Sequence, residues 1–398
     1  MTGRRSGFGA VAFAFLIVMA FATLPSPLYG LYRERDGLST LTITVVYAIF
    51  AGGTIASLIA VPALARRIGR RGVMLAAVAT MMVAAGLLAV WKALPGLLLG
   101  RLITGIAVGL VAGTATTYLI ELHIRRDPNG SPTRARNIGT AVNVGALGIG
   151  PLVAGCLAAW VREPLTVPYL LWIALGAVAL VGLAAAPETG APAPPADETG
   201  PRTRAARIPG PAGTATLAAF SANGLFAGLS GLLLVTTFHQ PSHALAGATL
   251  FVVFSAGVGS QLATASLPAP RVLALGTVSM LVGLVLLVTA VRLSTPSLAL
   301  FLVGGAFIGA GAGAVFKGTT GLVLQAASPQ DRLAMTSQLL IALFIGLSIP
   351  VIGAGVALDQ GASAPDTVLG FAVLVGLGVA AAGWELLGRA PKAAKQLA

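Results

Sequence analysis

Charged side chains are scarce in this chain of 398 residues, since Asp, Glu, Lys and Arg make up only 9% of it while 56% is hydrophobic. A soluble domain usually carries about 25% charged residues. So little charge cannot cover a surface that faces water, and lipid must replace water over most of the exterior. The composition therefore excludes a sizeable catalytic domain outside the membrane.

Cysteine and histidine are also nearly absent. Cys156 is the only cysteine, which excludes an intramolecular disulfide and a cysteine metal cluster. His239 and His243 have the spacing of a helical zinc site, but Pro241 lies between them and no third ligand is near. We predict no metal, no cofactor and no enzymatic activity, because an intramembrane enzyme or a receptor would need clustered His, Asp, Glu or Cys.

Long apolar runs, in contrast, recur along the whole chain. A hydrocarbon core of about 30 Å needs about 20 apolar residues per helix. The run Phe8–Leu24 could pass for a signal peptide, but Ala22–Pro25 is a poor cleavage site, and we interpret the run as the first membrane helix. We predict an all-α membrane protein with twelve spans, at residues 8–30, 41–64, 73–91, 97–121, 138–160, 168–186, 214–237, 246–267, 272–291, 298–322, 333–357 and 368–388.

A segment rich in Pro, Ala and charge separates the sixth span from the seventh. Residues 187–211 read PETGAPAPPADETGPRTRAARIPGP, which cannot cross lipid and is typical of a flexible linker. We predict an N-terminal six-helix bundle at 1–187, a cytoplasmic linker at 188–213 and a C-terminal six-helix bundle at 214–398.

The net charge of +13 predicts orientation rather than a nucleic-acid partner, because Lys and Arg are retained on the cytoplasmic side of a membrane. With both termini cytoplasmic, most of the 25 basic residues fall in cytoplasmic loops. The outer loops then hold only Arg33, Arg35, Lys92, Arg162 and Arg292, and Arg101 and Lys317 lie inside helices. We expect a multi-pass protein of a bacterial cytoplasmic membrane, acting as a monomer.

The two predicted halves share a glycine pattern. Glycines recur every four residues in the fourth and tenth spans, and Pro151 and Pro350 recur with nearly the same offset in the fifth and eleventh. Small residues at this spacing let a neighbouring helix approach the backbone closely. With 51 glycines a chance match is the alternative, but the common offset favours a duplicated repeat. The two triplets are Gly105, Gly109 and Gly113, and Gly305, Gly309 and Gly313.

The run VPALARRIGRRGVML after the second span resembles the loop signature of the major facilitator superfamily, G-x-L-a-D-R-x-G-R-R. Pro62 stands in its first glycine slot and Arg66 in its aspartate slot. The resemblance implies the major facilitator fold and a gating role for this loop, although Arg66 puts the usual aspartate latch in doubt. The alternative is a positive-inside anchor. The matching residues are Leu64, Ala65, Arg67, Gly69, Arg70 and Arg71.

The fourth span, LLLGRLITGIAVG, resembles the family pattern l-x-x-x-R-x-x-q-G through Leu97, Arg101 and Gly105, with Thr104 in the glutamine slot. The resemblance implies that Arg101 takes part in proton coupling. An intramembrane guanidinium is costly and must find a carboxylate, a carbonyl or water. The alternative is that Arg101 extends to the outer surface.

The fifth span, NVGALGIGPLVAG, resembles the antiporter signature g-x-x-x-G-P-x-x-G-G of the twelve-span drug:proton antiporter branch. Gly150, Pro151 and Gly155 match it, and Ala146 and Ala154 occupy glycine slots. Proline and glycine here shape a helix interface rather than perform chemistry. The resemblance implies proton-coupled efflux of small amphipathic compounds by alternating access. The alternative is an uptake or exchange carrier for a metabolite such as a sugar or organic anion.

Proton coupling needs a titratable group, yet no acid lies at mid-membrane in the predicted topology. Glu121, at the inner end of the fourth span, and Asp36, just beyond the first, are the candidates. Glu121 lies about 30 Å along the helix from Arg101, so the two cannot pair directly. The alternative role of Glu121 is to pair with the basic inner loops.

A substrate cavity is predicted from polar residues in the spans. Pro25 and Pro27 interrupt the first span, and broken helices line cavities in transporters, although a loop that begins early is the alternative. Lys317 would suit an anionic substrate, with extension toward the inner surface as its alternative. The candidate cavity residues are Tyr29, Tyr32, Asn143, Asn223, Gln261 and Lys317.

Overall fold

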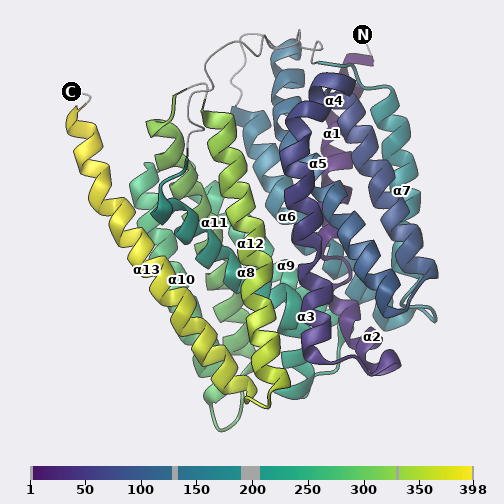
Figure 1. The fold of residues 1–398 in the computed structure, drawn as a ribbon, viewed down its shortest axis with the longest axis vertical. Helices are drawn as coiled ribbons and strands as arrows, with labels where there is room; N and C mark the ends of the chain where they lie inside the picture. The colour runs from purple at the N-terminus through teal and green to yellow at the C-terminus, as the bar shows by residue number, and fades with distance from the viewer. Residues whose placement is uncertain (1–2, 128–132, 190–206, 329–330, 397–398) are drawn as a thin grey trace. The chain divides into compact units, whose positions relative to one another are not determined.

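The computed structural model describes residues 3–127, 133–189, 207–328 and 331–396, and the regular elements in these ranges are helical (Figure 1). The chain forms two compact units. Unit 1 comprises residues 1–37 and 49–200, and unit 2 comprises residues 38–48 and 201–398. Most of the predicted linker, residues 190–206, lies outside the described residues.

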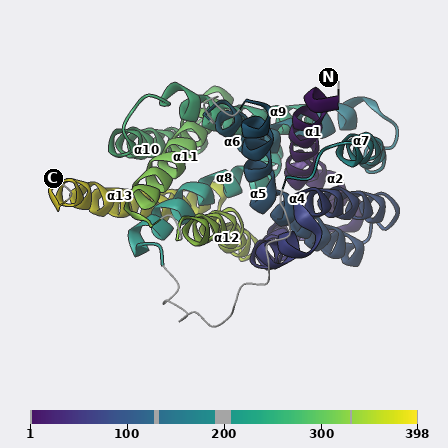
Figure 2. The same ribbon diagram turned by 90° about the horizontal axis from the view of Figure 1, so that it is seen from above.

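Among the described residues, unit 1 is built from five long helical stretches, two of which are interrupted. Figure 2 views its helices roughly end-on, and α5 packs against both α4 and α1. The elements are α1 (Gly3–Thr23), the short 3₁₀ helix η1 (Ser26–Leu28), α2 (Tyr29–Asp36), α4 (Phe50–Val90), α5 (Leu94–Arg126), α6 (Thr133–Trp160) and α7 (Val167–Ala184).

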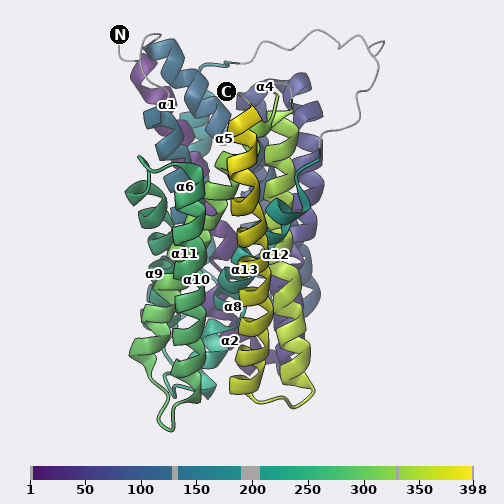
Figure 3. The ribbon, with the colours of Figure 1, turned by 90° about the vertical axis from the view of Figure 1, so that its left-hand side faces the viewer.

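Unit 2 contains six further long helices and one short helix from early in the chain. Figure 3 shows α10 and α11 side by side, with α9 and α13 packed against this pair. The elements are α3 (Thr40–Ala48), α8 (Gly210–Thr236), α9 (His243–Ala263), α10 (Ala269–Arg292), α11 (Leu298–Ala326), α12 (Arg332–Asp359) and α13 (Ala364–Gln396).

The structure contains eleven apolar helical segments long enough to cross a membrane among the described residues. One of them, Thr40–Val90, has 51 residues, which is about twice the length that one crossing needs. It is interrupted at Gly69, whose φ of 74° is not helical. This segment therefore accounts for two crossings, and the predicted all-α fold with twelve spans is confirmed.

The second predicted span, residues 41–64, is shared between the units. Its first part, α3, packs against α12 and α8, where the backbone N–H of Thr40 donates to Asp359 at 3.0 Å and a Cβ at Gly355 would lie 2.2 Å from the Thr44 hydroxyl. Its second part begins α4 in unit 1 at Phe50. Chain order alone would have placed the whole span in unit 1.

The glycine pattern predicted to mark a repeat positions equivalent helices in both units. In unit 1, a Cβ at Gly109 would lie 2.4 Å from the carbonyl oxygen of Thr54 in α4. In unit 2, a Cβ at Gly309 would lie 1.9 Å from that of Val253 in α9. Real Cβ atoms do not approach other atoms this closely, so both helix pairs pack backbone against backbone. The predicted internal duplication is thus present in the packing.

The first span is interrupted where its prolines predict. α1 ends at Thr23, η1 follows, and α2 continues to Asp36, where Gly37 with a φ of 65° closes the helix. The loop that we gave as the alternative is wrong, because Tyr29 and Tyr32 are helical. Asp36, predicted to lie beyond the helix, is the last residue of α2.

Candidate functional site

Arg101 is completely buried in unit 1, with none of its surface exposed. Its Nη1 donates to the carbonyl oxygen of Ala22 at 2.6 Å, and its guanidinium lies 4.8 Å from the centre of the Phe50 ring. Ala22 is in the last turn of α1, where carbonyl groups have no partner within the helix and the helix dipole favours a cation. The suggestion that Arg101 extends to the membrane surface is therefore wrong.

Three buried tyrosines belong with this cation to what we call the Arg101 cluster: Arg101, Tyr29, Tyr32 and Tyr169. The hydroxyl groups of Tyr32 and Tyr169 lie 3.2 Å apart, and electrostatic interactions connect Tyr29 and Tyr169 with Arg101. The hydroxyl of Tyr29 makes no hydrogen bond to any described residue. The cluster thus joins α2, α5 and α7 of one unit.

Sequence reasoning missed Tyr169. It stands near the start of α7, next to the apolar end of the predicted span, where a tyrosine is usual at a membrane interface. The structure buries it completely, with its ring edge-on to Phe21 at a centroid distance of 6.3 Å. The only signal in the sequence was its position in the first turn of a helix that follows the outer loop.

The internal repeat gives unit 2 a position equivalent to Arg101. Counting back four residues from Gly105 and from Gly305 leads to Arg101 in α5 and to Phe301 in α11. Phe301 is also fully buried, and its ring centre lies 5.1 Å from that of Phe226 and 4.9 Å from that of Phe238. Unit 2 therefore fills this position with an apolar aromatic group.

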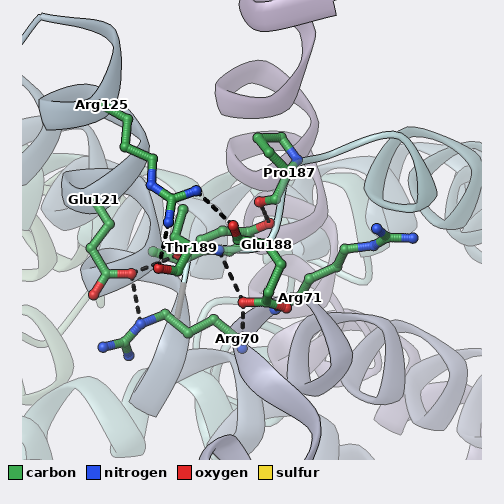
Figure 4. A network of polar contacts seen from close by, with 8 residues as sticks. Arg70, Arg71, Glu121, Arg125, Pro187, Glu188 and Thr189 are labelled. Carbon is green, nitrogen blue, oxygen red and sulfur yellow. Dashed lines mark hydrogen bonds and ion pairs between the residues drawn. The ribbon is translucent and has the colours of Figure 1, made fainter. Parts of the chain in front are cut away.

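A second polar site, which we call the Glu188 network, lies at the end of unit 1 where α4 is interrupted (Figure 4). The backbone N–H groups of Arg70 and Arg71 donate to the two carboxylate oxygens of Glu188, each at 3.0 Å. These N–H groups begin the helix that restarts after Gly69, so the carboxylate caps its positive end. A Cβ at Gly69 would lie 2.6 Å from Glu188 Oε2, so this position needs glycine for space as well as for its φ.

Further contacts of the Glu188 network connect α5 with the end of α7. Arg70 Nε lies 2.7 Å from Glu121 Oε2, which also accepts the hydroxyl of Thr189 at 2.6 Å. The guanidinium of Arg125 donates to the backbone carbonyls of Glu188 and Thr189 at 2.6 and 2.7 Å (Figure 4). The network is completed by Tyr118, whose hydroxyl donates to the carbonyl of Pro187 at 2.7 Å.

This network changes the interpretation of the loop motif. Arg66, in the aspartate slot, and Arg67 are exposed, whereas Glu188 from beyond α7 brings a carboxylate to Gly69 and Arg70. Glu188 and Thr189 were predicted to begin the linker, and the structure holds both in unit 1. Arg125, Glu188 and Thr189 were not predicted as site residues, because their partners are more than 60 residues away in sequence.

The carboxylates occupy the ends of the helices. Among the described residues, every Asp and Glu side chain is exposed or partly exposed. Asp197 and Glu198 lie outside this part of the chain. Asp36 pairs with Arg35 at 2.8 Å, and the Arg35 guanidinium also donates to the carbonyl of Lys92 just before α5, so Asp36 and Glu121 lie near opposite ends of α5.

Unit 2 contains the second intramembrane cation. Lys317 Nζ donates to the carbonyl oxygen of Gln261 at 2.6 Å and lies 3.3 Å from the Thr264 hydroxyl, at the C-terminal end of α9. Its ammonium group therefore caps that helix rather than simply extending to the surface. Asn223 and Gln261 are buried and Asn143 is partly exposed. The cavity role predicted for these residues stays a prediction.

The antiporter-type motif packs α6 on α1. A Cβ at Gly150 would lie 1.9 Å from the carbonyl oxygen of Ala20, and Pro151 follows inside α6 without ending it. The Thr23 hydroxyl donates to the carbonyl of Leu147 at 2.6 Å in the same interface. The motif thus fixes the turn of α1 that precedes the carbonyl bound by Arg101.

No group of three or more potential metal ligands occurs among the residues that the structure describes. His239 lies in a loop with a φ of 55°, whereas His243 begins α9. The two side chains therefore do not share a helical face, as Pro241 predicts.

Two related bundles of membrane-spanning helices, with polar groups gathered where helices break, are typical of a membrane transporter. A sequence comparison agrees, since the model of the Major Facilitator Superfamily matches residues 11–268. The chain belongs to this superfamily. A comparison with curated proteins gives no match.

Among solved structures, a mutant of the nucleoside transporter NupG is similar, with a TM-score of 0.69 and 10% sequence identity. The match covers 97% of this chain and 99% of that one. At this identity the similarity shows the fold alone. Membership in the drug:proton antiporter branch stays a prediction.

Proposed function

We propose that this protein is a secondary active exporter, which moves small amphipathic compounds out of the cytoplasm by alternating access in exchange for protons. The observation that carries the proposal is the complete burial of Arg101 at the broken end of α1. A buried guanidinium is costly in a membrane protein. Unit 2 folds with Phe301 at the equivalent position, so the fold itself does not require a cation there.

The direction of transport is inferred from α6. Its Gly150-Pro151 sequence resembles the signature of drug:proton exporters and packs against the turn of α1 next to Ala22. A change in how α6 packs on α1 would therefore move the carbonyl group that Arg101 binds. This contact supports a coupling between the antiporter-type motif and the buried cation.

Asp36 and Glu121 are the titratable groups that we assign to proton exchange with the two compartments. They lie near opposite ends of α5, and each is paired with an arginine at 2.8 and 2.7 Å respectively. A carboxylate that binds a proton loses its ion pair. Protonation at either end would thus weaken contacts that hold the ends of the helices, while Arg101 supplies the fixed charge between them.

We assign the Glu188 network to the cytoplasmic end and to gating. The basic residues of the Gly69 loop and of the adjoining helix ends support this orientation, with both termini cytoplasmic in a bacterial membrane and the protein a monomer. Arg66 occupies the slot where the family signature has an aspartate. Glu188 supplies the negative charge that this aspartate would bring. Replacing Arg66 with aspartate should add a competing carboxylate and shift the balance between inward- and outward-open states. Labelling of single cysteines from each side, in a background without Cys156, measures this shift, and an unchanged pattern would show that Arg66 is only an anchor.

Uptake or exchange of a metabolite is the second candidate function. The fold of this chain is that of a known nucleoside transporter, so the fold fits this candidate as well as it fits export. The two candidates differ in the direction of substrate movement relative to the proton gradient.

The experiment is flux in proteoliposomes with an imposed pH gradient, preceded by a substrate screen in a strain that lacks its efflux pumps. Export coupled to protons predicts that substrate moves against the proton flow and that an uncoupler stops it. Movement of substrate in the direction of proton flow would favour uptake instead. Flux that does not respond to the gradient in either direction would contradict proton coupling.

A further inference from the structure

In the part of the chain that the structure describes, the buried interior carries positive charge only. Arg101 is the only charged residue in the buried class among the described residues, and Lys317 is partly buried. The carboxylates of the same part of the chain are exposed or partly exposed. An organic cation that crosses the membrane through such a protein meets repulsion and finds no buried carboxylate to replace its water.

The Arg101 cluster contains an incomplete hydrogen-bonding group. Tyr29 is only 4% exposed, and its hydroxyl makes no hydrogen bond to any described residue. A buried polar group in this state is costly, and a ligand or a water molecule would relieve the cost. Since electrostatic interactions join Tyr29 to Arg101, a ligand that reached this hydroxyl would also feel the guanidinium.

The chemistry of the cluster points to one kind of ligand. Guanidinium N–H groups only donate hydrogen bonds, and phenol hydroxyls donate to acceptors such as carboxylates. The rings of Phe50 and Phe21 next to the cluster provide apolar surface. The equivalent region of unit 2, with Phe226, Phe238 and Phe301 in contact, offers apolar rings in place of these donors.

We infer that the Arg101 cluster binds the oxyanion of an amphipathic organic anion, with Arg101 supplying the charge and the Tyr29 hydroxyl a hydrogen bond. The transporter then selects small carboxylates with an apolar body over organic cations of the same shape. This inference names the substrate class of the proposed exporter and rests on that function for its physiological meaning. Binding itself can be measured without transport.

The test is equilibrium binding to the purified full-length protein in detergent, without a pH gradient. Three probes share one apolar body: 1-naphthylacetate, its amide, and 1-naphthylmethylammonium. We expect the carboxylate to bind at least about tenfold more tightly than the ammonium, because only the carboxylate gains from the buried cation. An equal or stronger affinity for the ammonium, or no carboxylate binding up to about 1 mM, would overturn the inference.

Two variants locate the site. Tyr29→Phe should weaken carboxylate binding about tenfold, since a hydrogen bond to a charged group is lost. The matched control Tyr47→Phe removes a hydroxyl from a fully buried tyrosine of unit 2 and should leave the affinity unchanged. Equal losses in both variants would refute the assignment to the cluster.

Arg101→Gln should remove the preference for the carboxylate over the amide, and Arg101→Lys should retain part of it. If Arg101→Gln does not fold, Arg101→Lys and Tyr29→Phe decide the question. Selective carboxylate binding without proton-dependent flux would leave the inference intact and refute the proposed export. Proton-driven export of 1-naphthylmethylammonium would support the proposed export and refute the inferred preference for anions.

Discussion

The equivalent helices α5 and α11 pack in the same way but differ in what they bury. Each places glycines against the backbone of a neighbouring helix, α4 in unit 1 and α9 in unit 2. One turn earlier, α5 buries Arg101, which binds the Ala22 carbonyl, and α11 buries Phe301 among phenylalanines. Since the glycine packing is common to both units, the fold needs it. The buried cation occurs at this position in unit 1 only, so the fold does not need it. The predictions below test this difference.

The largest effect is expected for the two aligned positions themselves. Arg101→Ala should reduce pH-dependent transport in proteoliposomes to the rate of empty liposomes, because the buried charge is lost. Phe301→Leu, a conservative change in an apolar cluster, should cost less than about 1.5 kcal/mol of stability and retain coupling. Undiminished proton-coupled flux in Arg101→Ala would remove Arg101 from the mechanism.

The glycines of the close helix contacts should be equally sensitive in the two units. Gly109→Ala and Gly309→Ala each place a Cβ far too close to a backbone oxygen, at 2.4 Å in α5 and at 1.9 Å in α11. Over-packing of this kind costs about 1–3 kcal/mol, measurable as a lower midpoint of thermal unfolding in detergent. The controls Gly86→Ala and Gly259→Ala, which have no atom within 4 Å of the added Cβ, should be neutral. A loss at only one of the paired positions would contradict the common packing.

The Glu188 network belongs to unit 1 and should affect stability to a smaller degree. Glu188→Ala removes the acceptor for the N–H groups of Arg70 and Arg71 and should cost about 0.5–2 kcal/mol, the usual range for a helix cap. Glu34→Ala, which changes an exposed carboxylate of α2, is the control. We also expect single cysteines introduced near the Gly69 loop to be labelled more readily in Glu188→Ala than in the unchanged protein. A variant as stable as the control would show that water replaces the cap.

Lys317 should have the smallest effect. Lys317→Met removes the ammonium group from the C-terminal end of α9 and should cost about 0.3–1 kcal/mol, because the contact is partly solvated. Thermal unfolding measures this loss, and flux in the same preparation shows whether Lys317 also acts on substrate. Loss of transport with full stability would restore Lys317 as a cavity residue.

Much of the scaffold could be predicted from local sequence. The length of the apolar runs gave the twelve spans, and Pro25 and Pro27 correctly predicted the interruption of the first one. The four-residue glycine spacing indicated both close helix contacts. These signals are readable because lipid demands long apolar helices, and proline and glycine act on the backbone near their own position.

The candidate site could be predicted only in part. Arg101 and Glu121 were identified from patterns, but their partners were not, since Ala22 and Thr189 lie 79 and 68 residues away in sequence. Tyr169 and Glu188 carry no local signal of a site. Each resembles an ordinary residue at the end of an apolar helix.

The sequence by itself determined that this is an integral membrane protein, that it has two related sets of spans, and that carboxylates are absent from the middle of its helices. These properties follow from composition and spacing along the chain. Only the tertiary structure decided that α3 packs with unit 2, that Glu188 caps the helix after Gly69, and that tyrosines from two other helices interact electrostatically with Arg101. Such contacts depend on which helices are neighbours in space, and no local pattern in the chain specifies that.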